Sequence, residues 1–384
     1  MTDAPGVAIV GAALSDGPRA NHASPFLLCR QAADRALRDA GLGFGDVDGL
    51  MSTGTGTLPP IELAEYLGMR PTWMDSTSVG GSVWEVYVGH AAAAIRAGFA
   101  DVVLCVYGST TRADLKARRR RANLSFGARG PSQWDVPYGH TLIAKYAMAA
   151  RRHMHTYGTT IDHLAEVAVS ARHNAGLNPD AYYRDAITID DVAASPMVAD
   201  PFTTLHCCIR SDGGGAVVVT SAERARDCAP PPVWVLGTGE AASHTTMSEW
   251  DDFTISPAAV SGPAAFQRAG VSPADVDICQ VYDSFTYTVL VTLEDLGFCA
   301  KGEGGPFVTD GRLRLGGALP TNTDGGGLSA CHPGMRGMFL LVEATRQLRG
   351  EAGERQVPGA EVACVHGTGG WFSSGATVIL GADR

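Results

Sequence analysis

Apolar residues along the chain fall into short continuous runs that alternate with longer segments of helical periodicity. Runs such as VAIVGAAL, DVVLCVYG and GGGAVVVT have the composition of strands that are buried on both faces. Segments such as SPFLLCRQAADRALRDAG and GMFLLVEATRQLRG repeat their apolar positions at helical spacing and end at a glycine, as amphipathic helices do. The pattern predicts an α/β protein with mainly parallel sheets covered by helices.

The same order of elements occurs twice. The letters AGL and DVD at residues 40–48 return as AGV and DVD at residues 269–277, in each case between a predicted helix and an apolar strand. The pair GHAAAAIRAG and DVVLCVYG returns as GMFLLVEATRQLRG and EVACVHGTGG, and the opening strand GVAIVGAAL returns as PVWVLGTGE. Three correspondences in one order indicate an internal duplication, and two such halves are expected to stack as a five-layer α/β/α/β/α sandwich.

A segment of different character interrupts the first half. It carries the basic run KARRRR at residues 116–121 and the helical patterns HTLIAKYAMAARRHMHTYG and IDHLAEVAVSARHNAG. We expect this inserted loop domain to cover the site as a cap. The predicted division is residues 1–112 with 201–229 for the first half, 113–200 for the cap, and 230–384 for the second half.

Composition and charge exclude several classes of function. With 384 residues and 45% hydrophobic residues, the chain can bury a large core. Its 30 Lys+Arg against 40 Asp+Glu give a net charge of −10, which argues against a broad nucleic-acid surface. No apolar stretch reaches the roughly 18 residues of a membrane span, and the start of the chain lacks a basic leader. The nine cysteines form no CxxC pair and no zinc spacing, so we expect buried thiols, no metal and a cytoplasmic location.

Four segments resemble the thiolase superfamily. DSTSVGGSVWEVYVGHAAAAIRAG is similar to the segment in which a nucleophilic cysteine opens a buried helix, and NTDGGGLSACHPGMRG is similar to the family's Gly-Gly…Gly-His-Pro-x-Gly motif. PFTTLHCCIRSDGGG and YDSF resemble segments of sterol-carrier-protein thiolases, in which the second reads His-Asp-Cys-Phe. Together they cover nearly the whole chain. The resemblance implies the thiolase fold.

Both cysteines of the thiolase reaction are missing. Gly81 stands at the position of the nucleophile, and Tyr282 and Ser284 replace the histidine and cysteine of the His-Asp-Cys-Phe motif. A thiolase needs one cysteine to carry the acyl group and another to move the Cα proton, so the ordinary reaction is excluded. The loss of the cysteine side chain is also expected to leave room for a branched Cβ of a substrate.

The same losses are found in thiolase-like lipid-transfer proteins, some of which resemble steroid side-chain retro-aldolases. This resemblance implies a carbon–carbon lyase of the retro-aldol type. Its substrate would be a β-hydroxyacyl-CoA with a bulky acyl group, such as a steroid side chain. The products would be a ketone and a short acyl-CoA, formed without a covalent cysteine intermediate.

A retro-aldol cleavage needs a base at the β-hydroxyl and a donor at the developing oxyanion. The resemblance implies His332 as the oxyanion donor and Tyr282 as the base. The structural alternatives are a packed amphipathic ring for Tyr282 and a helix cap for His332. Asp283 and His366 complete the catalytic candidates, and for Asp283 a role in orienting neighbours or capping backbone amides stays open.

Backbone amides are further candidates. Gly81 lies at a helix start, where exposed amides bind oxyanions, and Gly369 and Gly370 lie in the loop HGTGGWFSSG. Alternatively, these glycines only permit tight turns. The candidates for substrate binding are Ser284, Asn322, Trp371 and Arg118, of which Arg118 belongs to the basic run that either meets the nucleotide phosphates of coenzyme A or forms a solvated face.

Two other functions stay open, namely acyl transfer with Ser82 or another cysteine as nucleophile, and a non-catalytic acyl-CoA-binding subunit. No covalently bound cofactor is expected, and coenzyme A enters as part of the substrate. The resemblance also implies a homodimer, and a small partner with an OB-fold and a zinc ribbon that would complete a heterotetramer. Neither nucleic acid nor membrane is expected as a partner.

Overall fold

The computed structural model describes residues 6–117, 130–138 and 141–383. The first half contains β1 (Val7–Leu14), α1 (Pro25–Asp39), β2 (Gly49–Met51), α2 (Pro59–Leu67), β3 (Trp73–Asp75), α3 (Val83–Arg96), β4 (Val102–Ser109), β7 (Gly213–Ser221) and α8 (Ala222–Ala225). Between β4 and β7 lie α4 (Thr111–Lys116), α5 (Leu142–Tyr157), α6 (Ile161–Gly176), α7 (Ile189–Ala194), β5 (Met197–Ala199) and β6 (Phe202–Thr203). The second half contains β8 (Val233–Ala242), α9 (Ala258–Ala269), β9 (Ile278–Val281), α10 (Thr286–Asp295), α11 (Gly304–Phe307), α12 (Gly337–Leu348), β10 (Val362–Gly369) and β11 (Ser374–Gly381).

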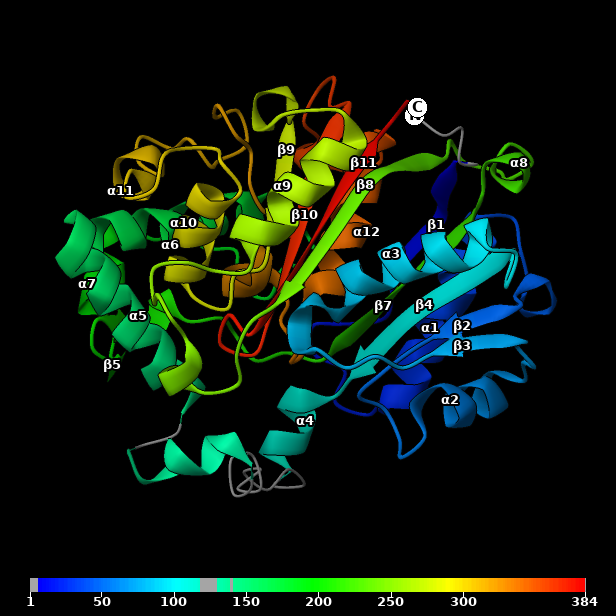
Figure 1. Cartoon of the computed structure of the whole chain (residues 1–384), viewed down its shortest axis with the longest axis horizontal. Coiled ribbons are helices and arrows are strands. Elements are labelled where there is room, and N and C mark those ends of the chain that lie inside the picture. The colour runs from blue at the N-terminus through cyan, green and yellow to red at the C-terminus, as the bar shows by residue number, and fades with distance from the viewer. Residues whose placement is uncertain (1–5, 118–129, 139–140, 384) are drawn as a thin grey trace.

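The order of the strands confirms the predicted duplication. In the described part of the chain the large sheet runs β3-β2-β4-β7-β1-β8-β11-β10-β9. Its two halves join where β1 pairs with β8, and the equivalent strands then follow outward in the same order, β1-β7-β4-β2 on one side and β8-β11-β10-β9 on the other. Figure 1 shows the first half on the right and the second half on the left.

The direction of the strands differs from the prediction. Only β2 with β3, β2 with β4, and β9 with β10 are parallel among the described pairs of the large sheet. The pairs that join β4, β7, β1, β8, β11 and β10 in sequence are antiparallel. The prediction of mainly parallel sheets was wrong because continuous apolar runs indicate burial on both faces, and helices cover both faces here whatever the direction of the strands.

Helices and sheet halves form the predicted layers. α3 and α12 contact each other and strands of both halves, so they make the middle layer, whereas α1 packs against β1, β4 and β7, and α9 packs against β8 and β11. α1 begins where the Ser24 side chain accepts the amide of Leu27, and α9 ends at Gly270 with a left-handed φ of 73°.

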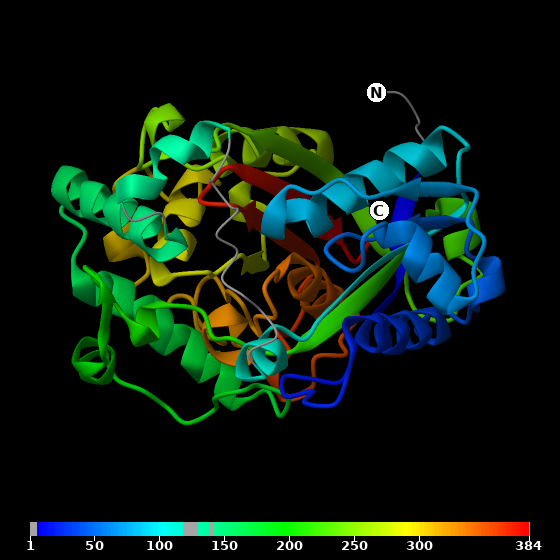
Figure 2. The same cartoon turned by 90° about the horizontal axis from the view of Figure 1, so that it is seen from below.

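The cap helices lie at the end of the molecule that the second half occupies, as the view from below shows (Figure 2). His153 of α5 is buried and contacts Glu294 of α10 at 3.0 Å, and Lys301 contacts the same carboxylate at 3.1 Å. The strands β5 and β6 pair across the predicted border at residues 200 and 201, so the exact domain limits stay a prediction. Across the described ranges, no helix has both the length and the apolar character needed to cross a membrane.

The middle layer holds a buried carboxyl group. Glu85 of α3 is 1% exposed, and within the described structure neither of its carboxyl oxygens has a hydrogen-bond partner. Its side chain occupies the space above Gly337 and Gly367, where a Cβ atom would lie 2.7 Å from Oε1 and 2.6 Å from Cδ of Glu85, respectively. Burial raises the pKa of Glu85 well above its ordinary value of 4.5, so the group is a neutral acid over a wide pH range.

Replacing Glu85 by glutamine is expected to stabilise the protein at neutral pH. The folded state holds the Glu85 proton to a higher pH than the unfolded state does, so the wild type loses stability as the pH rises above 4.5, and Glu85→Gln removes this loss. The midpoint of thermal unfolding, measured over a pH series, gives the difference in stability between the wild type and Glu85→Gln. The exposed Glu65→Gln on α2 is the matched control. A difference that is the same at every pH would contradict the assignment.

Candidate active site

Two side chains from the second half meet near the middle layer. Tyr282 directly follows β9, and its amide donates to the carbonyl of His366 at 2.9 Å. His332 lies in the loop before α12. The Tyr282 hydroxyl and Nε2 of His332 are 3.1 Å apart, and the two rings are perpendicular. Tyr282 is buried and His332 is partly exposed.

The surroundings keep both groups of the pair uncharged. Burial raises the pKa of Tyr282 well above 10, and a hydrogen bond from the Arg336 backbone opposes this only in part. Burial, and next the charge of Arg336, lower the pKa of His332 to about 4. At neutral pH the phenol therefore keeps its proton and the imidazole is unprotonated. In the tautomer of His332 that carries its proton on Nδ1, the hydroxyl donates to Nε2.

The ring of Tyr282 occupies the space next to Gly81. A Cβ atom on Gly81 would lie 2.6 Å from Cζ of Tyr282 and 2.5 Å from the carbonyl oxygen of Thr368. Neither distance is tolerated by a real side chain. The tyrosine ring therefore fills the space in which the side chain of a cysteine at position 81 would begin, and room for a branched Cβ of a substrate stays a prediction. Gly81 is thus a steric requirement of Tyr282.

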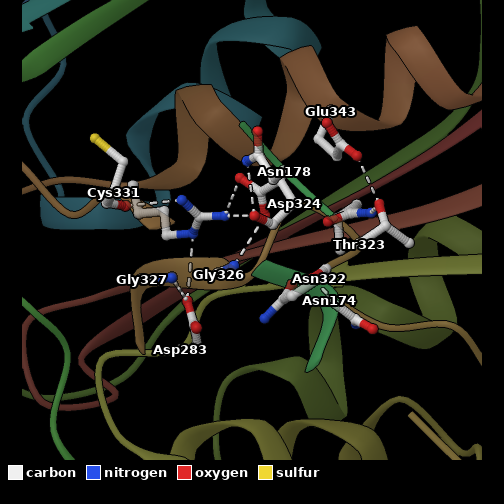
Figure 3. A network of polar contacts seen from close by, with 12 residues as sticks. Asn174, Asn178, Asp283, Asn322, Thr323, Asp324, Gly326, Gly327, Cys331 and Glu343 are labelled. Atoms are coloured by element: carbon white, nitrogen blue, oxygen red, sulfur yellow. Dashed lines mark hydrogen bonds and ion pairs between the residues drawn. The ribbon is translucent and has the colours of Figure 1, made fainter. Parts of the chain in front are cut away.

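A buried ionic network contacts the chain neighbours of the pair, Asp283 and Cys331, and Figure 3 shows these residues with Asp324. Asp283, the residue after Tyr282, accepts the amides of Gly327 and Leu328 at 2.7 and 3.0 Å. Arg336 lies 3.3 Å from Asp283, donates to both carboxylate oxygens of Asp324 at 2.6 and 2.7 Å, and donates to the carbonyl of Cys331 at 2.8 Å. In these contacts Asp283 caps two backbone amides and lies beside Arg336, which agrees with its structural reading.

The backbone around His332 is fixed by the first half. The amide of His332 donates to the Ser211 hydroxyl at 2.8 Å, and the amide of Ser211 donates back to the His332 carbonyl at 3.3 Å. Tyr107, near the end of β4, donates its hydroxyl to the Pro333 carbonyl at 2.8 Å. Residues of both halves therefore hold the imidazole in place.

The glycine segments predicted as an oxyanion site do come together. A Cβ atom on Gly80 would lie 2.8 Å from the amide nitrogen of Gly370 and 2.9 Å from Cα of Gly369. From the cap, Tyr146 donates to the Gly370 carbonyl at 3.1 Å and accepts the Phe372 amide at 3.2 Å. Close approach of two backbones explains the glycines, and the binding of an oxyanion by their amides stays a prediction.

The side chains of three other candidates form contacts within the second half and not with the Tyr282–His332 pair. His366 is buried on the face of β10 that packs toward α9, where Nδ1 lies 2.9 Å from the Thr377 hydroxyl, so the structure does not bring it to the pair. Asn322 accepts the amide of Val281 at 2.9 Å and supports the strand before Tyr282. Ser284 lies 3.0 Å from the Thr288 hydroxyl.

The remaining candidates differ in their surroundings. Trp371 is 5% exposed, with the Lys145 ammonium 3.6 Å from its ring centre, so it joins the glycine loop to the cap. Ser82, the alternative nucleophile, lies 2.9 Å from the Ser374 hydroxyl and 3.4 Å from the Val79 carbonyl, and neither group is a base. Arg118 lies outside the described residues.

Several residues of the site were not predicted. Arg336, Asp324 and Ser211 carry the contacts described above, although the sequence places them only inside the HPGMRG, NTDGGG and IRSDGGG segments. The signal for Arg336 and Asp324 was the occurrence of a charged residue among small and apolar residues. Such a residue is expected to be buried, and a buried ion needs a partner of opposite charge. The sequence does not reveal which partner that is.

Comparisons with known proteins show the family to which the chain is similar. The family described as Thiolase C-terminal domain-like matches residues 239–382. The steroid side-chain-cleaving aldolase of Thermomonospora curvata is 34% identical, with 100% of both chains covered. The 17-hydroxy-3-oxo-4-pregnene-20-carboxyl-CoA lyase of Mycobacterium tuberculosis is 36% identical over 97% of this chain and 98% of that protein. The solved structure of the Ltp2-ChsH2(DUF35) aldolase is 34% identical, with a TM-score of 0.90 and 99% of both chains covered.

The chain is therefore a member of the thiolase superfamily. Within it, the chain belongs with the aldolases and CoA lyases that match it over nearly its full length, and the predicted thiolase fold is confirmed.

Restoring a cysteine at position 81 is not expected to restore thiolase chemistry. In Gly81→Cys the new side chain meets the Tyr282 ring, so we expect a loss of about 1–3 kcal/mol in the free energy of unfolding from overpacking. Denaturant unfolding measures this loss. Intact-protein mass spectrometry after incubation with acetyl-CoA is expected to find no acyl adduct.

A double-mutant cycle separates this contact from other effects. Gly81→Ala alone is expected to destabilise more than Gly81→Ala does in a Tyr282→Ala background, because the ring is then absent. Gly45→Ala is the control, since a Cβ atom there meets nothing within 4 Å. An acyl adduct on Gly81→Cys, or equal costs of Gly81→Ala in the two backgrounds, would overturn the steric assignment.

Proposed function

We propose that this protein is a retro-aldol lyase that cleaves a β-hydroxyacyl-CoA with a steroid side chain into a ketone and a short acyl-CoA. The observation that carries the proposal is the uncharged Tyr282–His332 pair next to Gly81, where no cysteine can be acylated. The likeness to two enzymes of steroid side-chain cleavage over nearly the whole chain supports the steroid acyl group.

The pair supplies a path for the proton. The substrate hydroxyl gives its proton to the Tyr282 oxygen while Tyr282 passes its own proton to Nε2 of His332. The Cα–Cβ bond then breaks, Cβ becomes the carbonyl of the ketone, and the electron pair forms the enolate of the short thioester. The same pair returns one proton to Cα. Atoms and charges balance without a cofactor or a covalent intermediate.

This path changes the role expected for His332. A phenol with a pKa well above 10 is no base at rest, whereas an unprotonated imidazole accepts a proton directly. We assign His332 as the terminal base and Tyr282 as the relay, in place of an oxyanion donor and a base. Stabilisation of the enolate oxygen then falls to the amides around Gly81, Gly369 and Gly370.

We further propose that coenzyme A enters only as part of the substrate and that the active unit is a complex. The Ltp2-ChsH2(DUF35) neighbour supports a second kind of subunit, which we propose to be the small OB-fold and zinc-ribbon protein. A heterotetramer built on a homodimer of this chain is the proposed assembly. Co-purification with the gene-neighbour OB-fold protein, followed by mass measurement in solution, tests it.

Tyr282→Phe is expected to lower kcat by about a hundredfold or more, because the ring stays but the relay is broken. His332→Gln is expected to lower kcat by a similar factor. The double variant Tyr282→Phe/His332→Gln is expected to lower kcat no further, since the two residues act as a unit. The assay mixes the complex with a β-hydroxyacyl-CoA and measures release of short acyl-CoA without consumption of free CoA. Tyr287→Phe, which loses the bond of another buried tyrosine to the Phe253 carbonyl, is the control.

The pH dependence of the same assay is a separate test. Because the pKa of His332 is lowered to about 4, the base stays available between pH 4 and the ordinary histidine value of 6.5. Activity is expected to persist in this range and to fall as the pH drops through about 4. Loss of activity near 6.5, or full activity of Tyr282→Phe, would refute the relay.

The two other functions have their own signatures in these experiments. A stable acyl adduct would favour acyl transfer, although neither hydrogen-bond partner of Ser82 in the described structure, the Val79 carbonyl and the Ser374 hydroxyl, is a base. Binding of acyl-CoA without turnover in any complex would favour a binding subunit.

A further inference from the structure

The polar network behind the pair contains one buried cation close to the imidazole. Arg336 is 0% exposed and lies four residues after His332, at the start of α12. Because the buried charge of a guanidinium needs anionic partners, its contacts are informative. They run to Asp283, to Asp324 and to the carbonyl of Cys331.

These contacts connect the two loops that carry the pair. Asp283 is the chain neighbour of Tyr282, and Cys331 is the chain neighbour of His332. One planar group therefore spans the gap between the Tyr282 loop and the His332 loop. A Cβ atom on Gly327 would meet Asp283, His332 and Arg336 within 2.9 to 3.1 Å, so the three side chains converge on one glycine.

We infer that Arg336 is a positioning residue of the proposed lyase site: it fixes the distance between Tyr282 and His332, and its buried positive charge keeps His332 in the unprotonated form that accepts the relayed proton. This inference rests on the proposed function. It adds the residue that controls the charge state of the base.

Few charges act on the imidazole. Tyr282 and the thiols of Cys208 and Cys331 are kept neutral, since burial raises the pKa of each. The charged groups of the network are then Arg336, Asp283 and Asp324. Burial raises the pKa of Asp283 to about 6, whereas Arg336 holds that of Asp324 below its ordinary value despite burial. Arg336 is in direct contact with both carboxylates and carries the network's positive charge.

The cation acts on the imidazole even though its charge is compensated. Asp283 and Asp324 pair with Arg336, so the network as a whole carries no net positive charge. Arg336 nevertheless lowers the pKa of His332, after burial as the larger cause. It therefore disfavours a second positive charge on His332 and favours the proton-accepting state of the base.

Variants with opposite expected shifts test the inference. Asp324→Asn removes a negative charge near Arg336 and is expected to lower the pH at which His332 titrates. The double variant Arg336→Gln/Asp324→Asn removes the cation without leaving Asp324 ionised, and is expected to raise that pH by about one unit. Glu343→Gln is the control, since Glu343 pairs with Arg355 and Thr323 at the far end of the network. NMR titration of labelled histidine rings without substrate, with His332 identified from His332→Gln, measures the shifts.

The readouts separate this inference from the lyase function. The titration reports on Arg336 even if no substrate is cleaved, whereas the product assay reports on the lyase alone. The pH at which kcat falls on the acid side is expected to shift in the same direction as the titration of His332. Arg336→Lys keeps the positive charge but loses the planar guanidinium that binds several acceptors at once. It is expected to leave the titration of His332 near the wild-type pH while lowering kcat. Equal titration of the double variant and the wild type, or shifts of one sign in both Asp324 variants, would overturn the inference.

Discussion

The site depends on the exclusion of any side chain from position 81. The Tyr282 ring and the Thr368 carbonyl occupy the space into which a Cβ atom on Gly81 would point. Because the ring lies there, its hydroxyl reaches Nε2 of His332 at 3.1 Å. A steric constraint at the start of α3 in the first half therefore sets the geometry of a hydrogen bond between two residues of the second half.

The middle layer joins this constraint to the rest of the fold. Glu85, one turn after Gly81, packs over Gly337 and Gly367, which open α12 and precede the glycine loop. Arg336 precedes Gly337 and binds the carboxylates behind Tyr282. An uncharged acid and a compensated cation thus both lie at the start of α12.

The sequence predicted the duplication because apolar periodicity and glycine helix ends are local signals, and α6 was predicted residue for residue at 161–176. Strand direction was not predictable in this way, since burial of both faces looks the same in either direction. Tyr282 and His332 were found through motifs, but their contact, the filled space at Gly81 and the partners of Arg336 all depend on chain segments that are remote in sequence. The scaffold contacts of Asn322 and His366 were missed for the same reason.

The absence of a cysteine at position 81 and the presence of Tyr282 follow from the same steric constraint. A cysteine at 81 with Tyr282 unchanged has no space, and Gly81 without Tyr282 leaves His332 with no hydroxyl partner at Nε2 among the described contacts. The two positions are therefore sterically coupled. In the proposed mechanism, the group that relays the proton occupies the space into which a side chain at position 81 would point, so the same contact that favours the relay excludes an acyl-enzyme at this position.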